Sequence, residues 1–521
     1  MSMSNSLKSA ISRRGFVAAS AATAAISTLV STALADVPEE TKDSPVEPYD
    51  QIDCDICVVG AGISGLAAAV QASENGTKVL LIEKAGFVGG NGMGTEGIFA
   101  IDSHYQIEQG IEIAPADILS KELEEAQFRA DGSMWYDMVS HSAANIDWLE
   151  ENGVLFSGIV DNYHTGLYQT MHWWEGSAGA IGYVPPMQAA AEKNGCEIRT
   201  DTRGIEIVLE DGKVAGLLAE DSNGIVRINA KAVILATGGI GHNEKLLAQK
   251  GWTRQHLDEM IVQGMPAVEG DGYTMAIAAG GRSELGHTCD QTFLAVKAFG
   301  VDMTPPYDSP LNGGFGIAAA GNLIWINQDA DRFTNEGIAY VNMAATGPAC
   351  IGNRESYIVF DQSVLDSYKT NDDDIAAIES ALSGEFSDCI ATADSIEGLA
   401  TAFNLDAETL TTTIARYNEL CATGIDTDFG KMPQLMVPIA NPPFYIAKLV
   451  MLLVAVDGGI KTNKYAQVLD KDLYPIPGLY AVGLDGAMLW RDVYTQNMAG
   501  TAMANNVNSG RNAANHACTL L

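Results

Sequence analysis

Short apolar runs in the first half of the chain predict strands that are buried on both faces. Residues 55–59, 78–82 and 231–239 are such runs, and none shows the alternation with polar residues that marks a half-exposed strand. An alanine-rich stretch after the first run suits a crossover helix. Because strands joined by crossover helices are parallel, the pattern predicts an α/β fold built on a parallel sheet.

Further elements are predicted in the same half of the chain. Residues 117–153 carry apolar side chains at helical spacing and end at a glycine, so a helical segment is expected there. Residues 195–208 and 213–218 have the composition of strands, and an Asp-Gly turn at 211–212 precedes the second. Residues 270–281 predict another alanine-rich helix that stops at a glycine pair.

Gly60, Gly62 and Gly65 directly follow the first apolar run and have the GxGxxG spacing of a dinucleotide-binding turn. The first glycine permits a tight turn, the second lets backbone N–H groups approach a pyrophosphate, and the third lets helix and strand pack closely. Glu83 ends the second run, where a carboxylate accepts hydrogen bonds from an adenosine ribose. Together these features predict a dinucleotide site and favour a cofactor without a 2′-phosphate.

Two further stretches allow more than one interpretation. Residues 86–97 are rich in glycine and could run along the cofactor, or they could form a surface loop. Residues 172–174, His-Trp-Trp, precede the glycine-rich residues 176–182. These aromatic side chains could line a planar ligand or pack in the core.

The composition limits the classes of partner. The chain has 521 residues, of which 47% are hydrophobic, enough for a large core divided into two or more lobes. Its formal charge of −36 argues against nucleic acid and anionic membrane surfaces as partners, because both are polyanions. A solvated acidic surface that favours solubility explains the charge more simply.

The N-terminal residues are similar to a twin-arginine export signal. Residues 12–17, Ser-Arg-Arg-Gly-Phe-Val, precede an alanine-rich apolar run and a small-x-small site at 33–35. We therefore expect residues 1–35 to direct export to the periplasm or the cell surface. The run is short and moderately apolar, so no stable membrane span is expected in the mature chain. Residues 36–50 are expected to form a linker.

The eight cysteines have no spacing typical of metal ligands or haem attachment. Cys54 and Cys57 form a CxxC on a predicted strand, where an offset of three directs side chains to opposite faces. No CxxCH occurs, so no c-type haem is expected. The sequence predicts no metal centre.

Several motifs resemble the flavoprotein family of fumarate reductase, succinate dehydrogenase and 3-oxosteroid dehydrogenase. Besides the glycine motif they are residues 82–84, 89–91, 236–239 and 270–272, and their order and spacing match from about residue 50 to the end. The resemblance implies a Rossmann-like FAD-binding domain with a parallel sheet, discontinuous in sequence, and an inserted α+β capping domain.

The same resemblance implies domain boundaries and the state of the cofactor. Residues 51–285 and 455–521 would form the FAD-binding domain, and residues 286–454 the capping domain that holds substrate. Family members with covalent flavin carry a histidine just before the position of Gly97. This chain has none there, so the FAD is expected to be noncovalent.

Cofactor contacts are implied for a set of mostly small residues. They are Gly60, Ala61, Gly62, Ser64, Gly65, Glu83, Lys84, Gly89, Gly90, Asn91, Gly97, Gly204, Ala236, Thr237, Gly238, Gly239, Asp271, Gly483, Asp485, Ala502 and Met503. Asp485 is named because Leu484 stands where many members have a Glu that binds the ribityl chain.

The capping region contains the RFxNE signature of the family at residues 332–336. Fumarate reductases have a proton-donating arginine eight residues beyond the first residue of this signature, whereas this chain has Tyr340. Their other substrate and proton-relay residues are also replaced. The matching positions hold Phe315, Gly316, Ala319, Ala455 and Asn497. Without paired cations a dicarboxylate would bind poorly, so fumarate is an unfavoured substrate.

Tyr340 resembles the tyrosine of the 3-oxosteroid dehydrogenase branch, which exchanges a proton beside a carbonyl. A phenol can protonate the α-carbon of a polarised C=C bond without a perturbed pKa, while flavin N5 gives hydride to the β-carbon. The resemblance also places Tyr494, Asn497 and Gly500 at the last helix, near flavin O2 and the substrate carbonyl. A core tyrosine is the alternative for Tyr340.

The sequence therefore predicts an exported FAD-dependent reductase of an activated alkene, of the aryl-acrylate or enone type. No haem or second flavin segment is visible, so the expected electron donor is a separate protein, such as a cytochrome or a quinol-linked carrier. A 3-oxosteroid dehydrogenase or reductase is one alternative. A noncatalytic electron-shuttling flavoprotein is another.

Overall fold

The structure is a computed structural model, and it describes residues 47–163, 166–300, 311, 313–486 and 489–521. Residues 48–521 form one compact unit. The predicted export signal, residues 1–35, lies outside the described residues and most of the predicted linker does too. No helix among the described residues is long and apolar enough to cross a membrane.

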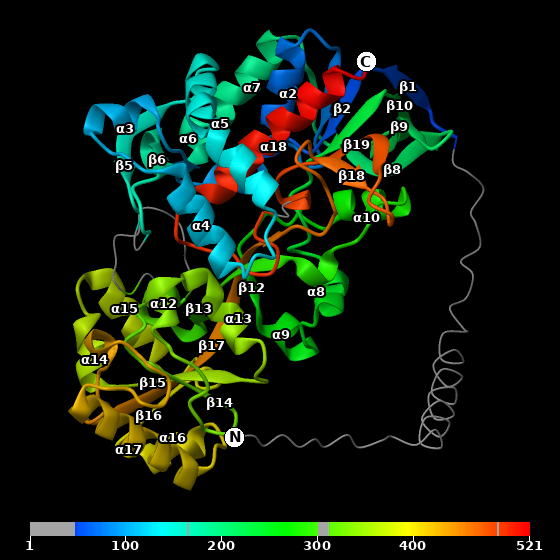
Figure 1. Cartoon of the computed structure of the whole chain (residues 1–521). Helices are drawn as coiled ribbons and strands as arrows, with labels where there is room; N and C mark the ends of the chain where they lie inside the picture. The colour runs from blue at the N-terminus through cyan, green and yellow to red at the C-terminus, as the bar shows by residue number, and fades with distance from the viewer. Residues whose placement is uncertain (1–46, 164–165, 301–310, 312, 487–488) are drawn as a thin grey trace, which may run out of the picture. The chain divides into compact units, whose positions relative to one another are not determined.

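A six-stranded, mostly parallel sheet forms the centre of the FAD-binding domain (Figure 1). Five neighbouring strands are parallel and the edge strand β18 is antiparallel. In sheet order the strands are β18 Gln467–Leu469, β19 Pro475–Ala481, β11 Ala232–Leu235, β2 Ile56–Val59, β3 Val79–Ile82 and β7 Glu197–Arg199. The predicted α/β fold with a parallel sheet is confirmed, including three of its strands.

The two faces of this sheet are buried by different layers. Ile56 and Val58 of β2 pack in one hydrophobic core, whereas Cys57 and Val59 pack in another. The first core includes α2 Ile63–Glu74 and α18 Thr501–Cys518, which lie side by side although they are far apart in the chain (Figure 1). A Cβ on Gly510 would lie 2.5 Å from the Ser64 carbonyl oxygen, so this close approach of helices requires glycine.

Two smaller sheets complete the domain. One is antiparallel except at its edge, with the order β1 Asp50–Asp53, β10 Gly224–Asn229, β9 Lys213–Asp221 and β8 Arg203–Glu210. The other contains β4 Gly97–Phe99, β6 Met171–Trp174 and β5 Phe156–Asp161. The aromatic residues of β6 belong to this sheet, and Trp174 is fully buried in the core.

The helical spacing predicted at 117–153 is confirmed, and the structure divides the segment into two helices. They are α4 Pro115–Glu125 and α5 Gly132–Glu151. Gln127 and Phe128 between them have φ values of 51° and 58°, which an α-helix cannot accommodate. The break matters for function because α4 reaches the segment that precedes α18.

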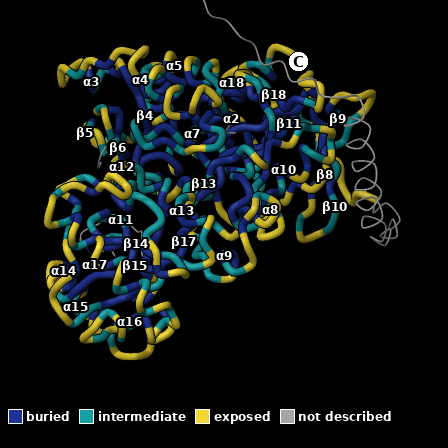
Figure 2. Tube along the Cα trace, turned by 60° about the horizontal axis from the view of Figure 1, so that its bottom comes forward, coloured by how far each residue is buried: buried dark blue, intermediate teal, exposed yellow. Residues whose placement is uncertain are grey.

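The capping domain is organised by one long strand, β17 Phe444–Asp457. Its neighbours in the same sheet are β12 Ile261–Val262, β13 Cys289–Val296, β14 Ile324–Asn327, β15 Ser356–Asp361 and β16 Ile390–Ala393. The sheet therefore begins before the predicted boundary at residue 286, and β17 extends beyond the one at residue 454. Its strands and those of the FAD-binding sheet are buried, while exposed residues gather on outer turns and helix surfaces (Figure 2).

The RFxNE signature forms a buried ionic cluster that holds the capping domain together. Arg332 makes a two-pronged contact with Glu336, with both N···O distances at 2.8 Å, and also pairs with Asp426 at 3.0 Å. Lys431 lies 3.4 Å from the same Glu336 carboxylate and is fully buried. The signature therefore has a structural role here, because each buried charge is compensated by an opposite one.

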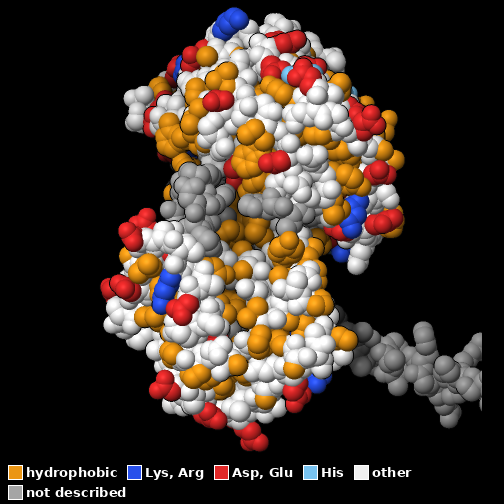
Figure 3. All heavy atoms as spheres, turned by 90° about the vertical axis from the view of Figure 1, so that its left-hand side faces the viewer, with side chains coloured by type: hydrophobic (Ala, Val, Ile, Leu, Met, Phe, Trp, Pro, Cys, Tyr) orange, Lys and Arg blue, Asp and Glu red, His pale blue; other side chains and the backbone are white. Residues whose placement is uncertain are grey.

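The surface agrees with the simple interpretation of the negative charge. On the face shown in Figure 3 the acidic side chains are scattered rather than gathered in one patch. Such a distribution is typical of a solvated surface and does not mark a single binding site.

Candidate active site

A cavity that is partly open to solvent lies at the carboxyl ends of β2, β3 and β11, where the glycine motif begins. Gly60 has a φ of +105°, and a Cβ there would lie 2.3 Å from the Ala236 carbonyl oxygen. A Cβ on Gly65 would lie 1.8 Å from the Gly60 carbonyl oxygen. The structure thus shows the tight turn and the close helix packing that were predicted for these two glycines.

Glu83 lines the cavity and is oriented by two backbone donors. Its carboxylate accepts hydrogen bonds from the Ala61 N–H at 2.7 Å and from the Ala85 N–H at 2.8 Å. Each carboxylate oxygen has a second acceptor site, so the group can still accept hydrogen bonds from a ribose.

A charged group that includes Asp271 borders the same cavity. The Asp271 carboxylate accepts a hydrogen bond from Lys84 Nζ at 3.2 Å and another from Arg203 Nε at 3.2 Å. Lys84 also pairs with Glu269. The contact with Arg203 was not predicted, because residue 203 is distant in sequence and lies beside the predicted Gly204.

Asp485 supports the 237–239 turn of the cavity wall, while its direct contact with the ribityl chain stays a prediction. It is fully buried and does not line the cavity, whereas Leu484 does. Its carboxylate accepts hydrogen bonds from the Thr237 N–H at 2.6 Å and the Gly239 N–H at 2.9 Å. Burial raises the pKa of Asp485 to about 6.

Most predicted cofactor residues surround the cavity. Those that line it are Gly60, Gly62, Ser64, Glu83, Lys84, Gly90, Asn91, Gly204, Ala236, Thr237, Gly238 and Asp271. Those absent from the lining are Ala61, Gly65, Gly89, Gly97, Gly239, Gly483, Asp485, Ala502 and Met503. Several of the second group permit close packing instead, as at Gly97, where a Cβ would lie 2.2 Å from the His172 carbonyl oxygen.

Other residues of the cavity wall were missed from the sequence: Phe87, Thr202, Met265, Ala267, Val268 and Asn506. They come from turns and from α18, and no local motif marks them. Asn506 Oδ1 is buried in this wall without a hydrogen-bond partner among the described residues. An unpartnered acceptor, a glycine-lined turn and an oriented carboxylate together fit an extended polar cofactor such as FAD.

An apolar cluster lies where the capping domain meets the segment before α18. Phe293, Phe315, Ala344 and Leu452 are buried together, and Tyr494 packs against them. The rings of Phe293 and Phe315 meet edge to face with centroids 5.6 Å apart. Phe315 belongs to this cluster and Ala319 packs against it.

Tyr494 has a predominantly nonpolar environment. Its ring lies 4.8 Å from that of Trp490. Burial, followed by the nearby Asp457 carboxyl and Cys289 thiol, raises the pKa of Tyr494 well above its ordinary value. The phenol therefore retains its proton at neutral pH.

Residues 494–497 bond alternately to the capping domain and to helix α4 of the FAD-binding domain. Asn342 Nδ2 donates to the Tyr494 carbonyl oxygen at 3.0 Å, and Gln496 Oε1 accepts from the Ala344 N–H at 3.3 Å, so these residues are held by the capping domain. Thr495 and Asn497 instead donate to carboxylates of α4. Gly500, with a φ of +83°, is the N-cap of α18.

Tyr340 lies on the short helix α12 Ile338–Val341 in the capping domain and is 50% exposed. It is not among the residues that line the large cavity. Asn342, two residues later, reaches the Tyr494 backbone. The structure thus brings this segment to the site, while the proton-donating role of Tyr340 stays a prediction.

Asp457 is a buried carboxyl that was missed from the sequence. It is fully buried at the end of β17 and accepts hydrogen bonds from Gln291 Nε2 at 2.8 Å and from the Cys289 thiol at 3.5 Å. Burial raises the pKa of Asp457 to about 7. A single aspartate gives no sequence signal, because its burial depends on the pairing of β13 with β17.

The prediction that Cys54 and Cys57 lie on opposite faces is wrong. Cys54 precedes β2, so strand alternation does not apply to it. Burial and then the neighbouring Cys54 thiol raise the pKa of Cys57 well above its ordinary value. All eight cysteines are free thiols.

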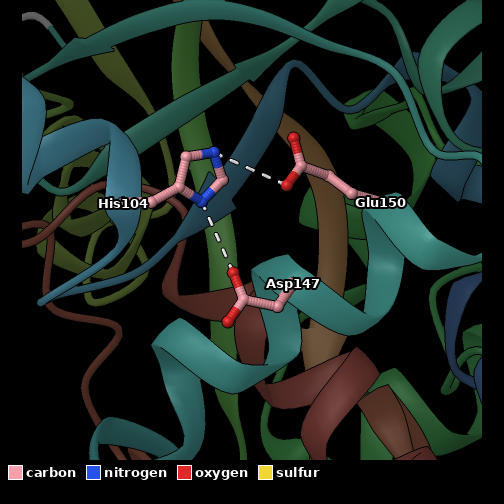
Figure 4. Close-up of side chains that lie close together, drawn as sticks. All are labelled: His104, Asp147 and Glu150. Carbon is pink, nitrogen blue, oxygen red and sulfur yellow. Dashed lines mark ion pairs between the residues drawn. The ribbon is translucent and has the colours of Figure 1, made fainter.

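The described residues include one group with possible metal ligands, His104, Asp147 and Glu150 (Figure 4). His104 Nδ1 lies 3.4 Å from Asp147, and its Nε2 lies 3.6 Å from Glu150. The imidazole lies between the carboxylates and presents a different nitrogen to each one (Figure 4). His104 thus lies within reach of two carboxylates of α5.

Comparison with known proteins agrees with this site. The model of the FAD binding domain family matches residues 55–490. Vinyl phenol reductase from Lactiplantibacillus plantarum is 32% identical over 485 residues, which cover 89% of this chain and 96% of that protein. Fumarate reductase (cytochrome) from Shewanella frigidimarina is 30% identical over 442 residues, which cover 84% of this chain and 72% of that protein.

Solved structures show the same fold. The structure of 3-ketosteroid delta1-dehydrogenase from Sterolibacterium denitrificans superimposes with a TM-score of 0.68 at 17% identity. The superposition covers 90% of this chain and 100% of that one.

Proposed function

Because this chain belongs to the FAD binding domain family and is an FAD-dependent oxidoreductase, we propose that it reduces the C=C bond of an activated alkene, of the aryl-acrylate or enone type. The double bond would be conjugated to an aromatic ring or a ketone. The observation that carries this proposal is the apolar cluster around Phe293, Phe315 and Tyr494. Its aromatic members offer flat apolar surfaces against which a conjugated substrate could pack.

The reaction needs one hydride and one proton. Bound FAD supplies the hydride from its N5 atom. The chain must therefore orient the alkene, exclude water and deliver the proton to the other carbon. Aromatic side chains of the cluster suit the first two tasks, because they offer flat apolar surfaces to a conjugated substrate.

We assign proton delivery to a phenol, with Tyr340 as the first candidate and Tyr494 as the second. Tyr340 has the sequence position that matches the proton-donating arginine of fumarate reductases. Tyr494 is favoured by its contact with the apolar cluster. Either phenol would regain its proton from solvent or from a buried carboxyl after turnover.

An anaerobic flavin reoxidation assay tests the proposal. The purified protein is reduced, and vinylarenes, enones, aryl-acrylates and fumarate are added separately. Rapid reoxidation by aryl-acrylates, enones or vinylarenes, with little response to fumarate, is the expected result. Reoxidation only by steroid ketones would favour a 3-oxosteroid reductase, and reoxidation only by cytochromes would favour an electron shuttle.

We also propose that the protein is exported and receives electrons from a separate cytochrome or quinol-linked donor. The twin-arginine motif in residues 1–35 supports export, and the kinship with a cytochrome-type fumarate reductase supports the donor class. N-terminal sequencing of secreted protein, with an Arg13→Lys/Arg14→Lys variant as control, tests export. Release of free FAD by acid precipitation tests noncovalent binding.

A further inference from the structure

The segment from Tyr494 to Asn497 is held from two sides. Its even-numbered residues contact the capping domain, through the Tyr494 ring and the Gln496 amide. Its odd-numbered residues bond to α4 of the FAD-binding domain. The position of the Tyr494 phenol therefore depends on α4 as well as on the apolar cluster that it touches.

Glu122 is the buried anchor on the α4 side. Its side chain is 1% exposed, although glutamates on helices are usually solvated. One carboxylate oxygen accepts a hydrogen bond from the Thr495 hydroxyl, and the other accepts from Asn497 Nδ2 at 3.3 Å. Glu125, one turn on, accepts from the same Asn497 amide at 2.6 Å. Asn497 is thus engaged by α4 in this structure.

We propose that Glu122 is a positioning residue that fixes the Thr495 and Asn497 side chains and thereby holds Tyr494 against the apolar cluster. This inference rests on the proposed alkene reduction at the same site. Because Thr495 directly follows Tyr494, loss of its anchor would let the phenol move while the cofactor cavity remained intact. Glu122 does not line that cavity.

The chemistry around Glu122 supports a fixed role. Burial raises the pKa of Glu122 to about 7, and the donors Thr495 and Asn497 oppose this effect. Glu125 raises the same pKa and Lys121 lowers it, both from its own helix. Burial of a carboxyl costs free energy unless hydrogen bonds compensate for the lost hydration. Here the donors Thr495 and Asn497 both belong to the segment beside Tyr494.

The test uses full-length holoenzyme with the variants Glu122→Leu, Glu122→Gln, Thr495→Val and the double variant Glu122→Leu/Thr495→Val. Glu124→Gln is the matched control, because Glu124 lies on the same helix and is exposed. Each protein is assayed for bound flavin, for kcat and KM with a vinylarene, and for amide hydrogen exchange in residues 489–500.

Glu122→Leu should lower kcat about tenfold, the effect of one lost buried hydrogen bond, with bound flavin unchanged. Glu122→Gln should lose less, and the double variant should be no worse than the poorer single variant. Exchange in residues 489–500 should rise in Glu122→Leu and not in Glu124→Gln. Equal kcat values for Glu122→Leu and Glu124→Gln, or multiplicative losses in the double variant, would overturn the inference. Failure of the wild type to react with any alkene would instead refute the proposed function.

Discussion

The buried carboxylate of Asp485 makes the most direct structural prediction, because it supports the cofactor cavity without lining it. Replacing Asp485 with Asn keeps the size of the side chain. The amide offers one acceptor oxygen in place of two, and its NH2 group must face a backbone N–H. Thr237 and Gly239 therefore compete for one acceptor, and one of their N–H groups loses its partner.

The magnitude follows from the contacts that are lost. Hydrogen bonds to an ionised group contribute about 1.5 to 3 kcal/mol each, and an unpaired buried donor adds to the cost. We expect a loss of about 3 kcal/mol in the stability of the 237–239 turn, a turn that contains Gly238 and Gly239 at φ values near +90°. If the whole of this free energy is lost from cofactor binding, the affinity for FAD falls roughly a hundredfold.

The assay is a fluorescence titration of apoprotein with FAD, supported by the flavin absorbance that remains after dialysis. Asp470→Asn is the control, because the Asp470 carboxylate also accepts two backbone N–H groups, at 2.9 Å each, but in a turn away from the cavity. The control should bind FAD like the wild type. If Asp485→Asn also binds FAD like the wild type, the supporting role assigned to this carboxylate is wrong.

Three further predictions concern the phenols, the ionic cluster and pH. Replacing the proton-donating tyrosine with Phe should lower kcat at least a hundredfold, so stopped-flow comparison of Tyr340→Phe and Tyr494→Phe decides between them; equal, small effects would exclude both. Lys431→Met should lower the free energy of unfolding by urea by about 3 to 5 kcal/mol, because it removes one of the cations that pair with the buried Glu336. The control Lys471→Met, at a side chain that is 85% exposed, should change the free energy of unfolding little. Burial raises the pKa of Asp457 from 3.8 to about 7, so between these values the native state binds a proton that the unfolded state has lost. The free energy of unfolding should therefore fall as pH rises from about 4 to 7. Asp457→Asn should reduce this dependence of stability on pH, and an unchanged dependence would contradict the assignment.

The local sequence determined the core of the cofactor site. Strand β2, the glycine turn, helix α2, strand β3 and Glu83 lie within one continuous stretch, so their geometry follows from neighbouring residues. The small residues at 236–238 and Asp271, which were named by resemblance to a family, line the same cavity. The break between α4 and α5 was missed, because apolar spacing continues across residues that leave the helical conformation.

Contacts between distant parts of the chain were decided only by tertiary structure. Asp485 bonds to a turn 246 to 248 residues away, and Thr495 bonds to Glu122 across 373 residues. Neither contact has a sequence signal, since hydrogen bonds of this kind depend on which elements the fold brings together. The sequence by itself determined the glycine turn and the acid of a dinucleotide-binding unit, and its resemblance to a family indicated the class of chemistry. The tertiary structure alone decided which buried carboxyls support it, because burial is a property of the packed chain and not of a residue type.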